Sequence, residues 1–182
     1  MRSSRVFLGT AVVGSMVGGA CVVGEDPASG GSGGAGGFGE ASAAITQCVT
    51  FRRGSNGTVA DAPIWQAYPT YNEGSGSNLW TGKTGTRARS LLRFDLSSIP
   101  SGAAITSASV SLYTSNSHLT TVNVHRATAS WNESTVTWSS FGTSYDSTIA
   151  STFTTGGWGT RTFNAAGLVQ QWVSGAAPND GF

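Results

Sequence analysis

The regular alternation of apolar and polar residues between Arg87 and Tyr113 constrains the fold of this 182-residue chain more than any other feature. The first apolar set is Leu92, Phe94 and Leu96, and after a polar break at 97–102 the second set is Ala108, Val110 and Leu112. A period of two residues is typical of a strand with one buried face. The segment therefore predicts two strands joined by a short polar connection, and it contains no nucleophile, metal cluster or cofactor loop.

The rest of the chain from Ile45 onward follows the same plan. Short runs rich in Thr, Ser, Val and aromatic residues are separated by turn signals such as Gly54-Ser55-Asn56-Gly57. This spacing favours an all-β fold, an antiparallel β-sandwich of the jelly-roll type. One short helix is predicted near the C-terminus, capped by Asn164 and ended by Gly175. Its apolar residues Ala165, Leu168, Val169 and Trp172 recur at helical spacing.

The N-terminal region predicts export. Residues 1–21 have the order of a signal peptide, with Arg2 and Arg5 before an apolar stretch and small residues at its end. Cys21 follows Gly18-Gly19-Ala20, the position at which a bacterial lipoprotein signal carries its lipidated cysteine. Lipidation of Cys21 and ordinary cleavage with an incidental thiol are both open. Residues 22–44 are rich in Gly and Ser and are expected to form a flexible linker before a domain at 45–182.

The cysteine content and the net charge of the chain narrow the class of protein further. If Cys21 is removed or lipidated, Cys48 remains alone, so we expect no disulfide and interpret Cys48 as a small buried hydrophobic residue. From Ile45 onward the chain has eight basic and six acidic residues, and this net charge of +2 is too small for a nucleic-acid-binding surface, so no nucleic-acid partner is expected.

Three separated blocks carry a resemblance to a known family. LLRFDLSSIPSGAAITSASVSLY, WNESTVTW and the closing AAGLVQQWVSGAAPNDGF resemble the DNRLRE domain, also described as carbohydrate-binding module family 96. The resemblance extends over roughly Cys48 to Phe182 and implies a secreted β-sandwich that holds a polysaccharide without cutting it. The family pattern continues into a final strand after the position of Phe182, so the chain is either a fragment or has a curtailed last strand.

Strand parity points to a candidate binding face. Side chains alternate across a strand, so Arg87, Arg89 and Arg93 point away from the core, and Tyr113 and His125 do the same on later strands. If these strands lie in one sheet, the five residues form a face suited to an anionic, uronate-type polysaccharide, because guanidinium groups pair with carboxylates. The alternatives are a solvated face with scattered charges, or sugar stacking at the loop between Trp65 and Trp80.

Catalysis and cofactors are not expected. A glycosidase needs two carboxyl groups about 5–10 Å apart in a cleft, and no two acidic residues stand out as a pair. His118 and His125 lack metal-ligand companions at useful spacing. No cofactor is predicted, and a structural calcium held by Asp61 or Asp95 is open.

The sequence therefore predicts a non-catalytic carbohydrate-binding module of a secreted protein. If Cys21 is lipidated, the protein is an outer-membrane lipoprotein, and that anchor is its one expected contact with a membrane. Two other functions are open. One is a structural cell-surface or matrix protein that acts through protein contacts, and the other is a fragment of a polysaccharide-degrading enzyme.

Overall fold

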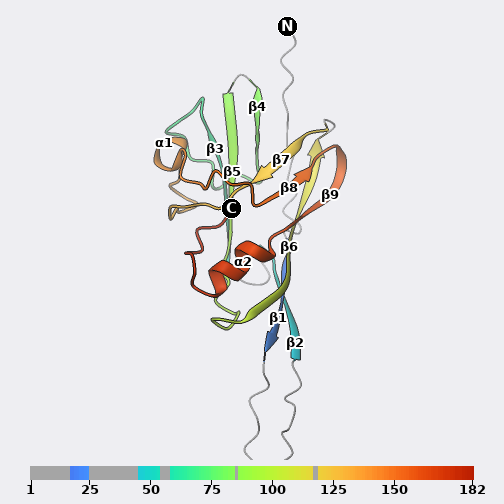
Figure 1. Cartoon of the computed structure of the whole chain (residues 1–182). Helices are drawn as coiled ribbons and strands as arrows, with labels where there is room; N and C mark the ends of the chain where they lie inside the picture. Colours follow the sequence, from blue (N-terminus) through green and yellow to red (C-terminus); the bar gives the residue numbers. More distant parts are fainter. Residues whose placement is uncertain (1–16, 25–44, 54–57, 85, 117–118) are drawn as a thin grey trace, which may run out of the picture.

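The computed structural model describes residues 17–24, 45–53, 58–84, 86–116 and 119–182. These residues form antiparallel strands with two short helices, and the all-β class is confirmed (Figure 1). The strands are β1 (Val17–Gly24), β2 (Ile45–Phe51), β3 (Val59–Trp65), β4 (Gly82–Thr84), β5 (Thr86–Phe94), β6 (Ala104–Asn116), β7 (Thr121–Val124), β8 (Ser151–Thr154) and β9 (Gly157–Asn164). The helices are α1 (Trp138–Phe141) and α2 (Ala166–Val173).

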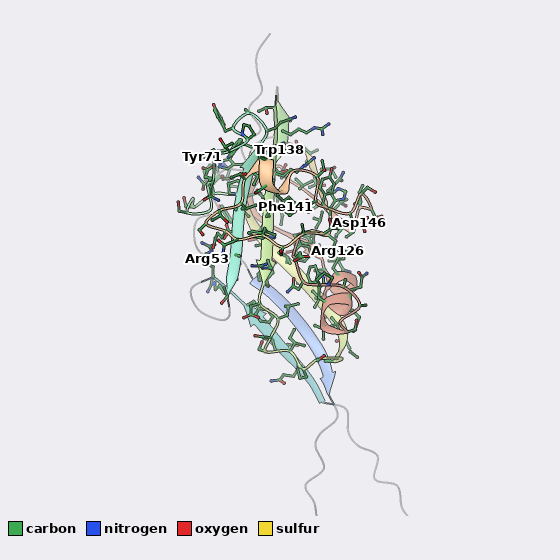
Figure 2. All side chains as sticks on the ribbon, turned by 90° about the vertical axis from the view of Figure 1, so that its left-hand side faces the viewer. Arg53, Tyr71, Arg126, Trp138, Phe141 and Asp146 are labelled. Carbon is green, nitrogen blue, oxygen red and sulfur yellow. The ribbon has the colours of Figure 1, made fainter. Side chains whose placement is uncertain are left out.

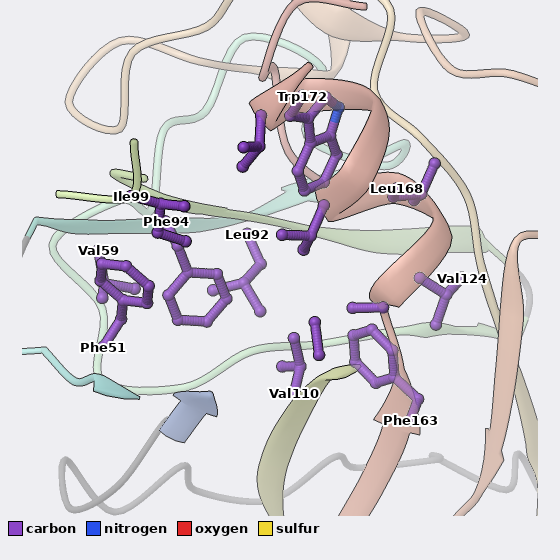
Figure 3. Close-up of a cluster of buried hydrophobic side chains, with 14 of the residues drawn as sticks. Phe51, Val59, Leu92, Phe94, Ile99, Val110, Val124, Phe163, Leu168 and Trp172 are labelled. Atoms are coloured by element: carbon purple, nitrogen blue, oxygen red, sulfur yellow. The ribbon is translucent and has the colours of Figure 1, made fainter. Parts of the chain in front are cut away.

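The strands are arranged in three antiparallel sheets. A four-stranded sheet has the order β2-β1-β6-β9, a three-stranded sheet has the order β3-β5-β4, and β7 pairs with β8. A large apolar core lies between the first two sheets, with Val110 and Phe163 on one side and Leu92 and Phe94 on the other (Figure 3). The alternation that identified the two strands therefore places their apolar residues in one core, which is the packing of a β-sandwich.

Helix α2 forms at the predicted place. The side chain of Asn164 accepts a hydrogen bond from the Ala166 backbone N–H at 2.8 Å, and Gly175 follows the helix with a φ of 76°. Leu168 and Trp172 are buried on the face that turns toward the core (Figure 3). The Gln170 side chain accepts from the Ile105 N–H at 2.7 Å, which ties the helix to the start of β6. Helix α1 was not predicted from the sequence.

A second apolar cluster lies on the other side of β5. Leu91 is 4% exposed and packs with residues of β3 and of the segment that follows β7. The whole cluster consists of Ala60, Ala62, Ile64, Leu91, Ala127, Trp131, Val136 and Phe141, with Trp138 packed against it. The expectation that this face of β5 is open to solvent is wrong, because residues 127–141 cover it.

The N-terminal boundary also differs from the expectation. Strand β1 pairs with β2 on one side and with β6 on the other, so Val22–Gly24 belong to a sheet rather than to a linker. Residues 1–16 of the expected signal and 25–44 of the expected linker lie outside the described residues. β-branched and small residues such as Val22 and Val23 suit a sheet as well as an export signal.

Cys48 is not a small buried hydrophobic residue. Its side chain is exposed and disulfide-bonded, so the prediction that the chain has no disulfide is wrong. The backbone of Cys21 lies directly opposite Cys48 in the register of β1 and β2. Sequence spacing could not show this, because the two cysteines are brought together by a pairing that was not expected.

The C-terminal residues are held against β5. Phe182 exchanges two backbone hydrogen bonds with Leu92, at 3.0 and 2.8 Å, and Gly181 accepts one from the Ala127 N–H at 2.8 Å. The indole of Trp131 donates to the Asp180 carbonyl at 2.7 Å. The Phe182 ring contacts both Phe163 and Trp172. The chain end thus joins the two apolar clusters, on either side of β5.

Two glycines test this anchoring. Gly181 and Gly175 have similar φ values of 85° and 76°, but a Cβ at Gly181 would collide with the Leu92 carbonyl, whereas at Gly175 it meets nothing within 4 Å. We expect Gly175→Ala to cost about 1–2 kcal/mol from the left-handed backbone, and Gly181→Ala to cost about 1–3 kcal/mol more from overpacking. Urea unfolding of both variants measures the difference. Equal losses would show that the contact with Leu92 does not stabilise the fold.

Candidate functional site

A cavity of about 470 Å³ lies between β5, β6 and β7. Its buried floor is apolar and includes Leu92, Phe153 and Phe163. More exposed polar and aromatic residues complete the lining, and these are Arg87, Arg89, Tyr113, Asn123, His125 and Tyr145. The cavity therefore combines an apolar interior with polar groups that reach solvent, the usual composition of a ligand site.

Four of the five predicted site residues border this cavity. Arg87 and Arg89 come from β5, Tyr113 from β6, and His125 from the end of β7. The assumption that these strands share one sheet is wrong, because β5, β6 and β7 belong to three different sheets. The residues still converge, since β5, β6 and β7 all contribute to the lining of the cavity.

Arg93 lies elsewhere. Its guanidinium carbon is 5.1 Å from the centre of the Trp131 ring, on the covered side of β5, and Arg93 does not line the cavity. Parity correctly separated Arg93 from the core-facing residues of β5 but could not show that residues 127–141 cover that side. Its place is a cation–π contact within the second cluster.

Arg89 is the most firmly held cation at the cavity. Its guanidinium carbon is 4.6 Å from the ring centres of both Trp138 and Tyr145. It donates to the Gly142 carbonyl and, at 3.2 Å, to the Tyr145 hydroxyl. Figure 2 shows this side of the molecule, with Trp138 and Phe141 near its middle. These partners could not be predicted from the sequence, because Tyr145 is 56 residues away from Arg89 in the chain.

His125 is oriented by its neighbours. Its Nδ1 lies 2.9 Å from the Asp146 carbonyl and 3.0 Å from the Thr148 carbonyl. The His125 ring meets the Tyr145 ring edge-on at 5.1 Å. Beside it, Arg126 and Asp146 form an ion pair at 3.3 Å (Figure 2). Hydrogen bonds from Thr148 hold the pKa of Asp146 below its usual value. Arg89, Tyr145 and His125 thus form a continuous contact along one side of the cavity.

The other predicted sugar-stacking position lies apart from the cavity. The Trp65 and Trp80 rings are 5.7 Å apart, and the Trp65 indole donates to the Glu73 carboxylate at 2.6 Å. Tyr68 and Tyr71 on the intervening loop are 64% and 53% exposed. The two tryptophans therefore contact each other, and the two tyrosines are the large aromatic residues that this loop exposes to solvent.

The carboxylates have structural partners. Arg53 forms ion pairs with both Asp61 and Glu133, and the Asp61 backbone N–H donates to Glu133 at 3.2 Å. The two carboxylates do meet, contrary to the expectation, but an arginine lies with them and neither lines the cavity. Asp95 accepts a hydrogen bond from the Ser97 N–H at 3.0 Å. No cluster of three or more metal-ligating side chains occurs among the described residues.

The chain matches a protein-family model over most of the region that forms this site. The model described as carbohydrate-binding module family 96 matches residues 55–177, which is more than half of the chain. The matched range contains the cavity-lining residues of β5, β6 and β7. No curated protein and no solved structure matches the chain.

The ion cluster of Arg53, Asp61 and Glu133 predicts an unusual pH dependence of the stability of the fold, because Asp61 is buried. Burial raises the pKa of Asp61 to about 6, against the opposing effect of Arg53. A raised folded-state pKa means that protonation of Asp61 stabilises the fold at low pH, and this stabilisation is lost as pH rises from about 4 to about 6. We expect wild type to lose about 3 kcal/mol relative to Asp61→Asn across that window, measured by urea unfolding at several pH values.

Asp95 supplies a control of opposite sign. Its hydrogen bonds from Ser97 lower its pKa, so its contribution is present at neutral pH and is lost as pH falls through the folded-state pKa. Wild type should therefore gain stability relative to Asp95→Asn as pH rises. A wild-type curve parallel to that of Asp61→Asn would contradict the raised pKa of Asp61.

Proposed function

The chain belongs to carbohydrate-binding module family 96, and from this membership we propose that the cavity between β5, β6 and β7 binds an anionic, uronate-type polysaccharide. A module of this kind is a non-catalytic domain that binds carbohydrate. The observation that carries the finer proposal is the convergence of Arg87, Arg89, Tyr113 and His125 on one cavity from three sheets.

The two arginines have different roles in this proposal. Arg89 is fixed between two aromatic rings, so its guanidinium loses little freedom when a carboxylate arrives. Arg87 is exposed and adds a mobile charge at the same cavity. The Tyr113 ring, 38% exposed, offers an apolar surface to a sugar ring, and His125 lies beside Tyr145 within reach of the cavity. Together they supply charge, hydrogen bonds and one stacking surface.

We also propose that the protein as a whole does no catalysis of its own. The carboxylates that come together, Asp61 and Glu133, are paired with Arg53 and lie away from the cavity. Sugar released from the bound polymer, measured as new reducing ends, would overturn this part of the proposal and favour a degradative enzyme.

Removal of the exposed guanidinium of Arg87 tests the proposal that the cavity binds a uronate polymer. Arg87→Ala should weaken retention on a uronate polymer about tenfold, because a charge-assisted hydrogen bond contributes roughly 1.5–3 kcal/mol. The loss should shrink at high salt, which screens the exposed charge. Affinity electrophoresis on alginate and pectate at two salt concentrations measures both effects.

Arg52→Ala is the matched control, because Arg52 is exposed and does not line the cavity. Equal weakening by Arg87→Ala and Arg52→Ala would show a general charge effect rather than a site. A wild-type protein that no polysaccharide retains would favour a structural surface protein that acts through protein contacts.

Export is the second part of the proposal. The N-terminal pattern supports it, and so does the disulfide at Cys48, since structural disulfides persist in oxidising compartments. Neither α1 nor α2, the helices of the described part, is long and apolar enough to cross a membrane. The chain has two cysteines, so within one molecule a disulfide at Cys48 and a lipid on Cys21 need the same sulfur.

The mass of the exported protein tests this. We expect a chain cleaved before Cys21, with a mass that rises by two hydrogens on reduction, because cleavage there leaves Cys21 and the rest of β1 in place. Mass spectrometry of the protein purified from its native exporting host measures it. An acylated Cys21 would instead show that the protein is a lipoprotein and that Cys48 has no partner in the same chain.

A further inference from the structure

The outer face of the β6–β9 pair has a composition unlike that of the rest of the surface. The register places Ser109, Ser111, Tyr113 and Ser115 of β6 opposite Asn164, Thr162, Thr160 and Trp158 of β9. Intervening residues such as Val110 and Phe163 are buried in the core, so the paired set faces outward. We call these eight residues the outer strip. They include five hydroxyl side chains without a ring, one amide and two aromatic rings, and no charge.

Trp158 is the most exposed aromatic residue of the described chain. It is 74% exposed, and its indole makes no hydrogen bond or ring contact with the described residues. Gly157 and Gly159 on either side of it have φ values of 76° and 149°. A tryptophan this exposed contributes little to the core and leaves a large apolar surface in water.

Tyr113 extends this surface along the sheet. Tyr113 pairs with Thr160, two residues beyond Trp158, so the two aromatic side chains are diagonal neighbours on one face, with Cα atoms about 7–8 Å apart. The hydroxyls of Ser111 and Thr162 are 2.9 Å apart on the same face. The strip therefore offers two rings followed by a row of hydroxyls along one face of the β6–β9 pair.

We propose that the outer strip is a second carbohydrate-binding site, for an uncharged polysaccharide chain. The apolar C–H face of a pyranose ring stacks on an exposed indole, and its hydroxyls pair with Ser and Thr side chains. The strip has no cation to recognise a carboxylate, which distinguishes it from the cavity with Arg87 and Arg89. This inference rests on the proposed function, because it starts from a member of this family binding carbohydrate. It adds a second place of binding and the kind of polysaccharide bound there.

The two surfaces are continuous at one residue. Tyr113 lines the cavity and also belongs to the outer strip. A long polymer could therefore contact both surfaces, or two different chains could occupy them. This continuity favours a polysaccharide over a protein as the occupant of the strip.

The test compares Trp158→Ala with Trp158→Phe and with Tyr68→Ala. Tyr68 is 64% exposed on the loop after β3 and serves as the control for loss of an exposed ring. The wild-type protein should be retained on insoluble cellulose, β-1,3-glucan or mannan. Trp158→Ala should reduce that retention about tenfold, and Trp158→Phe less, because it keeps a ring. Tyr68→Ala and Arg52→Ala should leave it unchanged, and added salt should have little effect.

The result is separable from that of the main proposal. If uronate polymers retain the protein and no neutral polymer does, the outer strip is not a glycan site and the cavity proposal stands. If neutral polymers retain it through Trp158 and Arg87→Ala leaves uronate binding unchanged, the cavity proposal fails alone. A wild-type dimer that Trp158→Ala converts to a monomer in sedimentation would also overturn the inference, since the strip would then be an interface between copies.

Discussion

Burial of both faces of β5 is the constraint on which the rest of the structure depends. Leu92 lies in the core between the sheets, while Leu91 lies in the second cluster under residues 127–141. Strand β5 also carries Arg87 and Arg89 and holds the chain end through Leu92. A strand fixed on both faces has a fully specified register, because a slip by one residue would exchange its two apolar sets. The positions of both cavity arginines follow from that register.

Sequence periodicity identified the buried face of β5 that carries Leu92 and missed the buried face that carries Leu91. The apolar alternation in β5 and β6 and the helical spacing before Gly175 were sufficient for the sandwich and for α2, because each pattern has one dominant buried face. Leu91 lies on the same face of β5 as Arg89 and Arg93, which parity assigns to solvent when the covering layer is unknown. That layer is an irregular segment containing Trp131 and Phe141, and irregular segments carry no period.

The candidate site shows the same limit in another form. Parity selected Arg87, Arg89, Tyr113 and His125, but the reasoning that placed them together assumed one sheet. They converge because three sheets meet around a cavity, which is a tertiary relation. Trp158 was not singled out from the sequence, since its exposure depends on the register of β9. Strand β1 was missed because small apolar residues suit both an export signal and a central strand.

The cavity and the outer strip differ because the cavity is lined by arginines, whereas the outer strip has no charged side chain. At the cavity, Arg89 is held between Trp138 and Tyr145, so part of its desolvation is already offset by ring contacts before any ligand binds. A cation prepared in this way attracts a carboxylate without a large ordering cost. On the outer strip the hydroxyls are hydrated and the exposed Trp158 indole leaves apolar surface in water, so the proposed binding there would depend on covering Trp158. Electrostatic binding at the cavity would weaken as the salt concentration rises, whereas apolar contact on the outer strip would change little. A polymer spanning Tyr113 would be held by both surfaces.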